Sequence, residues 1–173
     1  MSETASIGFH RRLGLAVAFV VLTLDQALKY FVTDVLELAH PLTQPIRLAP
    51  FFALTWTQNY GVSMGFLQAD TVLMRWLLVL LLVGISGFVS IWLWRERNRD
   101  DALALGLILG GAIGNIIDRA RLGYVIDYAD FHIGEWRPFL IFNLADAAIT
   151  IGVLILLARA LLLREKAASK EIN

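Results

Sequence analysis

Two carboxylates in this chain have the setting for acid–base chemistry. Asp146 lies inside a long apolar run, at about residues 139–163, and Asp127 lies in the segment before it. A carboxylate at membrane depth is costly and by default indicates a functional site. Two that meet at one membrane face cannot both ionise easily, so the pair holds one shared proton. This is the chemistry of an aspartyl protease, in which one carboxylate activates water and the other polarises the scissile carbonyl.

Further polar groups fall at a similar depth in the predicted helices. They recur three or four residues apart, which places them on one helix face. They are Asp25 with Lys29, Asn115 with Asp118 and Arg119, and Asn143 with Asp146. At about 1.5 Å of rise per residue, all lie in the outer half of a membrane. They either surround the carboxylate pair or, as Asp25–Lys29 and Asp118–Arg119 ion pairs, only hold the helices together.

Other hydrolytic chemistries lack the residues that they need. The chain has no cysteine, its three histidines lie outside the apolar runs, and it has no H-E-x-x-H motif. We therefore expect neither a metal nor another cofactor. A Ser–Lys dyad of Ser63 and Lys29 is a weaker possibility, because Ser63 lies in a loop of small residues.

The elements that must position these groups are membrane helices. Of the 173 residues, 58% are hydrophobic and 17% are charged, whereas about 25% are charged in a soluble domain. Four apolar stretches approach or exceed the roughly 20 residues that cross a bilayer. They lie at about 13–32, 72–94, 102–120 and 139–163. The formal net charge is zero, so nothing indicates a nucleic-acid partner.

Glycines mark the third predicted span. Gly106, Gly110 and Gly114 recur every four residues and therefore fall near one face. Small residues at this spacing let membrane helices approach closely. We expect that face to pack against a neighbouring helix.

The segments between the spans divide into an inner and an outer set. Basic residues cluster at one set of span ends, which should be cytoplasmic together with both termini; they are Arg11, Arg12, Arg95, Arg97, Arg99, Arg164, Lys166 and Lys170. The outer segments are then about 33–71 and 121–138. Within them, Ile46 to Thr57 is rich in β-forming residues and predicts a short strand or hairpin on the membrane surface. Residues 124–138 predict a second surface element.

These features together predict a mainly α membrane protein. It would have four transmembrane helices, a small extracytoplasmic β-rich cradle and the second surface element. Residues 1–173 would form a single membrane domain. No feature of the sequence indicates oligomerisation.

Five short motifs in this order resemble the bacterial lipoprotein signal peptidases, or type II signal peptidases, which are intramembrane aspartyl proteases. The resemblance covers the chain from Asp25 to about Ile151. The matching motifs are Asp25-Gln26-x-x-Lys29, Asn59-x-Gly61, Gly114-Asn115-x-x-Asp118-Arg119, Val125-Ile126-Asp127-Tyr128 and Phe142-Asn143-x-Ala145-Asp146. Each motif alone is weak, but five on the corresponding spans are specific.

The resemblance implies that Asp127 and Asp146 are the catalytic dyad. It implies active-site support or substrate binding for Asp25, Lys29, Asn59, Gly61, Asn115, Asp118, Arg119 and Asn143. It further implies a bacterial inner-membrane enzyme with its site near the outer face, in contact with membrane lipids. The implied substrate is a diacylglyceryl-modified prolipoprotein, cleaved on the N-terminal side of its lipidated cysteine.

Some alternatives remain open at this point. Asp130 follows Asp127 by three residues and competes with it for the dyad; otherwise we expect Asp130 to be a surface carboxylate. The same carboxylates would also suit a small proton-coupled transporter or a divalent-metal site. A structural subunit that binds a partner helix through its polar layer is a further possibility.

Overall fold

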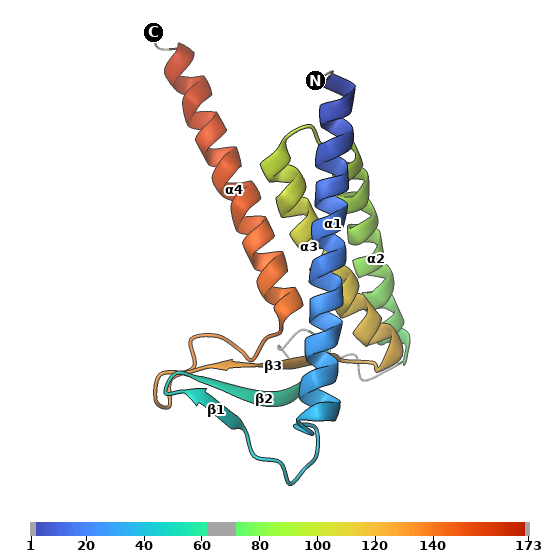
Figure 1. The fold of residues 1–173 in the computed structure, drawn as a ribbon, viewed down its shortest axis with the longest axis vertical. Coiled ribbons are helices and arrows are strands. Elements are labelled where there is room, and N and C mark those ends of the chain that lie inside the picture. Colours follow the sequence, from blue (N-terminus) through green and yellow to red (C-terminus); the bar gives the residue numbers. More distant parts are fainter. Residues whose placement is uncertain (1–2, 62–71, 172–173) are drawn as a thin grey trace.

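The computed structural model describes residues 3–61 and 72–171, which form four long helices and one small sheet (Figure 1). The helices are α1 (Glu3–Tyr30), α2 (Val72–Arg95), α3 (Arg99–Arg121) and α4 (Leu144–Glu171). Each contains a stretch that is long and apolar enough to cross a membrane. The prediction of a mainly α membrane fold with four spans is therefore confirmed. Ser63 lies outside the described residues.

The sheet lies at the end of the helices opposite the two chain termini (Figure 1). It has the antiparallel order β1 (Ile46–Ala49), β2 (Phe52–Asn59) and β3 (Val125–Phe131). The predicted hairpin is thus β1 and β2, and the second surface element supplies the third strand of the same sheet. A short π-helical segment, η1 (Phe31–Val35), continues α1 towards it.

Helix α3 is the central helix of the four. Half of its apolar window is buried, compared with 17–28% for the other three. A Cβ on Gly110 would lie 2.5 Å from the Ala18 carbonyl oxygen of α1, and a Cβ on Gly114 would lie 2.5 Å from Asp25 Oδ2. Gly106 faces the Gly14 carbonyl in the same way. The predicted glycine face therefore packs directly on α1.

Helix α4 begins five residues later than the predicted span. Phe142 first pairs with Ala129 of β3, and its carbonyl accepts the Ala129 amide at 2.8 Å. The Asn143 side chain then accepts the Asp146 amide at 2.9 Å, which is an N-cap bond. Asp146 consequently lies in the first turn of α4, not two turns into a span.

Arg75 joins the first turn of α2 to the last turn of α3. Its Nε donates to the Arg119 carbonyl at 2.8 Å, and Nη2 donates to the Ala120 carbonyl at 2.5 Å. These carbonyls belong to the last turn of α3, where helical acceptors lack intrahelical partners and a cation is favourable. This contact fixes the segment that leads from α3 into β3.

Candidate active site

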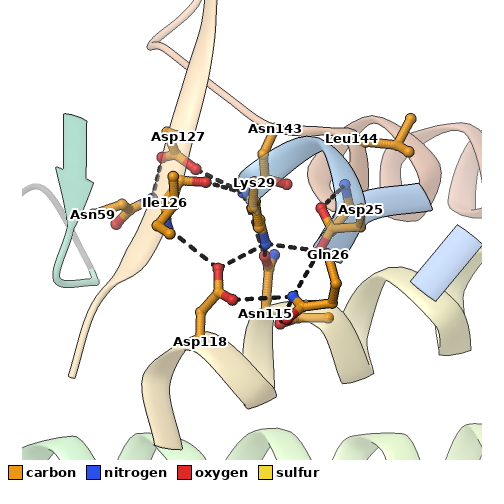
Figure 2. Close-up of polar contacts among 12 residues, drawn as sticks. Asp25, Gln26, Lys29, Asn59, Asn115, Asp118, Ile126, Asp127, Asn143 and Leu144 are labelled. Atoms are coloured by element: carbon orange, nitrogen blue, oxygen red, sulfur yellow. Dashed lines mark hydrogen bonds and ion pairs between the residues drawn. The ribbon is translucent and has the colours of Figure 1, made fainter. Parts of the chain in front are cut away.

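A buried lysine holds together the polar layer that the sequence predicts. Lys29 Nζ lies 2.8 Å from Asp25 Oδ2, 2.8 Å from Asp118 Oδ2 and 3.1 Å from Asn115 Oδ1 (Figure 2). These four side chains are buried. Because an unpaired buried charge is strongly destabilising, each of the three charges requires the others. Asp118 pairs with Lys29, and its neighbour Arg119 makes no ion pair among the described residues.

The Lys29 cluster also reaches the two elements that carry the candidate dyad. Asp25 Oδ1 accepts the Ala145 amide of α4 at 3.1 Å, and Asp118 Oδ2 accepts the Ile126 amide of β3 at 3.3 Å. Gln26 donates to Asp118 Oδ1 at 3.0 Å. The carboxylates of α1 and α3 thereby fix the backbone immediately beside Asp146 and Asp127.

Asp127 projects from β3 into a cage of amide donors. Asn143 Nδ2 donates to its Oδ1 at 2.6 Å, and Asn59 Nδ2 donates to its Oδ2 at 3.0 Å (Figure 2). The Asn59 amide is oriented in turn, because its Oδ1 accepts the Gly61 N–H at 3.0 Å. Gly61 has φ +120°, a backbone conformation that favours glycine.

Asp146 receives the complementary set of donors. Asn115 Nδ2 donates to its Oδ1 at 2.8 Å, and the Asn143 backbone N–H donates to its Oδ2 at 3.3 Å. With the return bond from the Asp146 amide to Asn143 Oδ1, this forms a reciprocal cap at the start of α4. Asn143 therefore contacts both aspartates, through its side chain and its backbone.

The electrostatics of the site favour the protonated form of Asp127 more than water does. Burial, and next the charge of Asp146, raise the pKa of Asp127 from 3.8 to about 6. Hydrogen bonds from Asn59 and Asn143 oppose that rise. A carboxyl with this pKa exchanges its proton near neutral pH, as a general acid–base pair requires.

Asp130 does not join this pair. It is buried, and Arg137 binds it through Nε–Oδ1 at 3.0 Å and Nη2–Oδ2 at 3.2 Å. Thr55 also donates to Asp130 at 3.4 Å. The expectation that Asp130 is a surface carboxylate is therefore wrong, because β2 and the segment after β3 cover it. No group of three or more His, Cys, Asp or Glu side chains within the described ranges could hold a metal ion.

Three cavities border the aspartates or the side chains that hold them. The first, of about 560 Å³, has Asp127 in its lining and is walled by the end of β2 and residues 137–141. The second, of about 420 Å³, lies among α2, α3 and α4 and includes Arg119, Asn115 and Asn59. The third, of about 350 Å³, is largely apolar and contains Asp146 together with Phe139, Leu140, Phe142 and Ile151. Hence each aspartate borders a cavity, and one of these cavities is suited to apolar chains.

Sequence reasoning missed several groups that support the site. Gln26 appears in a quoted motif, but its bridging role was not foreseen. The Arg75 contact and the Tyr128 hydroxyl, which accepts the Leu144 amide at 3.3 Å, were also missed. In the sequence, the position next to Asp25 was the one indication of a role for Gln26. The roles of Arg75 and Tyr128 depend on contacts with residues far away in the sequence.

Comparisons with known proteins identify the family of the chain. The family model described as signal peptidase (SPase) II matches residues 17–162. Lipoprotein signal peptidases of Rhizorhabdus wittichii and Sphingopyxis alaskensis are 54% and 52% identical, over 95% and 92% of this chain and 94% and 91% of theirs. Two bacterial membrane enzyme structures solved by the in meso method are 26% and 27% identical, with TM-scores of 0.68 and 0.71. Both structural matches cover 86% of this chain, and they cover 87% and 92% of the solved chains. The chain belongs to the signal peptidase II family of aspartyl peptidases.

Proposed function

We propose that this protein removes signal peptides from diacylglyceryl-modified prolipoproteins, with Asp127 and Asp146 as the catalytic dyad. The observation that carries the assignment of the dyad is Asn143, which hydrogen-bonds both carboxylates at once. The family membership of the chain supports the reaction itself.

The dyad acts through one shared proton and one water. The ionised carboxylate takes a proton from the water, which attacks the carbonyl carbon of the scissile peptide. The protonated carboxyl donates to the carbonyl oxygen, and the pair then transfers a proton to the leaving amine as the C–N bond breaks. Asn59, Asn115 and Asn143 hold the two carboxylates in place, because each donates an amide N–H to one of them. This preorganisation lowers the cost of reaching the transition state.

The cavities support a lipid-modified substrate. The cavity at Asp146 is lined mainly by apolar side chains and suits the acyl chains of a diacylglyceryl group. The cavity among α2, α3 and α4 includes Leu78, Leu82 and Ile149 and suits the end of an apolar signal helix. The scissile peptide bond, which joins the signal helix to the lipidated cysteine, would then lie at the dyad.

The proposed location is the bacterial inner membrane, with both termini in the cytoplasm and the sheet at the outer face. Arg11 and Arg12 lie in the N-terminal part of α1, and Arg95 and Arg97 lie at and just after the end of α2. These parts of the helices are far from the sheet (Figure 1), as the positive-inside rule requires. A signal peptide with its N-terminus inside would present its cleavage site at the opposite, outer end.

The decisive experiment is a gel-shift cleavage assay. Purified protein in detergent is mixed with a diacylglyceryl-modified prolipoprotein, with and without a chelator. The wild type should cleave it with or without the chelator, whereas Asp127→Asn and Asp146→Asn should each lose at least about a thousandfold in rate, since either removes the acid–base pair. Asp34→Asn is the matched control, because Asp34 is an exposed carboxylate of η1 outside the site.

Each outcome bears on a different part of the proposal. Full activity in either dyad variant would reject that aspartate as catalytic. Loss of cleavage on chelation would reject the metal-free mechanism. Absence of cleavage by folded wild type would reject the peptidase assignment and return the proton-coupled transporter to consideration.

A further inference from the structure

The cavity over Asp127 differs from the other two because none of its described lining residues lies in a helix. The end of β2 forms one wall, and residues 137–141 form the other. Among the described residues that line it, Asp127 and Arg137 are the two with charged side chains. A substrate segment that occupies this cavity would therefore meet one fixed cation beside the catalytic carboxylate.

Arg137 is held in position by a buried carboxylate, Asp130. Its Nε and Nη2 bind Asp130, whose side chain is only 4% exposed, while the Arg137 side chain is 55% exposed. His132 Nδ1 lies 3.8 Å from the same carboxylate. The third guanidinium nitrogen, Nη1, has no hydrogen-bond partner in the described part of the chain. An arginine anchored through one edge leaves its other edge to recognise a second acceptor, because the guanidinium is rigid and planar.

The direction of the substrate follows from the proposed function, on which this inference rests. The cavity at Asp146 is lined mainly by apolar side chains. The cavity among the helices has an apolar part, made by Leu78, Leu82 and Ile149, beside the polar Asn115 and Arg119. The polypeptide that continues beyond the lipidated cysteine enters water and needs a polar path. The cavity over Asp127 offers such a path along the sheet, because Thr57, Gln58 and Arg137 are in its lining.

We propose that this cavity binds the first residues after the lipidated cysteine and that Arg137 makes the enzyme favour an acidic side chain there. A carboxylate matches the free guanidinium edge, and a lysine is repelled by it. Asp130 neutralises part of the Arg137 charge and the site is open to water, so the preference is modest, about two- to fivefold at low salt. Asp130 is then the positioning residue for Arg137.

The test uses three prolipoproteins that differ only in the residue after the cysteine, which is Asp, Asn or Lys. For the wild type we expect kcat/KM to fall in that order, mainly through KM, and the differences to shrink as salt is added. Arg137→Gln should bring the three values together. Arg47→Gln should keep the wild-type order, because Arg47 is an exposed arginine of β1 that does not line the cavity.

A second pair of variants separates charge recognition from damage to the fold. Arg137→Gln leaves the buried Asp130 carboxylate without its arginine and could harm the fold. The double variant Arg137→Gln, Asp130→Asn removes both charges together and should also abolish the preference for an acidic residue. Asp130→Asn alone should weaken the preference, because a guanidinium released from its anchor loses more through disorder than it gains from the removed negative charge.

Three results would overturn the inference: equal kcat/KM for the three substrates in the wild type, a preference for Lys, or an unchanged preference in the double variant. Failure of the wild type to cleave any of the three would instead reject the proposed function.

Discussion

At the residue scale, the two aspartates occupy different environments. Asp127 is 1% exposed and accepts two side-chain amides, whereas Asp146 is partly exposed and borders the apolar cavity. The two carboxylates therefore differ in solvent access and in the donors that surround them.

The raised pKa of Asp127 predicts a pH dependence of cleavage. In the proposed mechanism the pair is active with one proton, and burial raises the pKa of Asp127 to about 6. Above that value kcat/KM should fall, approaching tenfold per pH unit as the pair loses its proton. A pH profile of wild-type cleavage measures this fall, and Asp34→Asn should leave its position unchanged. A rate that is flat from pH 5 to 9 would contradict the shared proton.

The same pKa predicts that the active site costs stability. The folded-state pKa of about 6 exceeds the ordinary 3.8, so the stability associated with protonated Asp127 is present below about pH 4 and is lost as the pH rises to about 6. At pH 7.5 the loss is about 3 kcal/mol, from 1.36 kcal/mol per pKa unit. Asp127→Asn has no carboxyl to ionise and avoids this loss. Its thermal midpoint, compared with that of the wild type, should therefore be higher at pH 7.5 than at pH 4. Thermal unfolding at the two pH values tests this, and an equal difference at both would argue against a buried, proton-binding Asp127.

Lys29 should be the most sensitive position of the buried cluster. Lys29→Met leaves Asp25 and Asp118 without their cation and should cost about 3–5 kcal/mol. Lys29→Met with Asp118→Asn leaves one carboxylate fewer and should recover part of that loss. Thermal midpoints in detergent measure both, and a single variant as stable as wild type would show that the ion pairs contribute nothing.

At the element scale, the close approach of α1 and α3 sets the geometry of the cluster. Gly110→Ala would place a methyl group 2.5 Å from the Ala18 carbonyl oxygen and should destabilise the fold by about 1–3 kcal/mol. Activity should fall as well, because the helices that carry Lys29 and Asn115 would separate. Gly84→Ala in α2 is the matched control, since its Cβ would meet nothing within 4 Å. Comparable losses of stability in both variants would mean that the close contact at position 110 contributes nothing beyond the general effect of replacing a glycine in these helices.

The helices were predictable from the sequence because their signals are local. Long apolar runs identify the spans, and the four-residue glycine repeat identifies the face of α3 that meets α1. The late start of α4 was not predictable, because Phe139 to Phe142 are as apolar as the helix that follows. The bridge from Phe142 to Ala129 of β3 holds the end of this segment outside the helix.

The candidate site residues also divide into those that local spacing predicts and those that depend on contacts between distant segments. Asp25, Lys29, Asn115 and Asp146 were found from depth and helical spacing, while the roles of Asn59 and Gly61 came only from the family resemblance. The partner of Asp118 is Lys29 of a different helix, because neighbours at i and i+1 point away from each other on a helix. The burial of Asp130 depends on strand pairing and an arginine seven residues away, and no spacing rule predicts either.

At the scale of the whole molecule, the sheet and the two termini lie at opposite ends of the four helices (Figure 1). This arrangement predicts the labelling of single cysteines, which is simple because the chain has none of its own. Leu42→Cys, at a site 82% exposed beyond α1, should react with a membrane-impermeant thiol reagent in intact cells freed of the outer membrane. Phe9→Cys near the N-terminus should react only after the membrane is opened. The reverse pattern would invert the proposed orientation.

The cavity at Asp146 is bordered by Phe139, Leu140 and Ile151, each more than half exposed on the surface that would face lipid. A reactant held in the bilayer therefore reaches the carboxylate by lateral diffusion in two dimensions. Its effective concentration is a mole fraction among lipids or detergent molecules, not an amount per litre. Adding empty micelles at constant enzyme and substrate should slow turnover by surface dilution, and Michaelis constants from different detergents become comparable only when expressed on that scale.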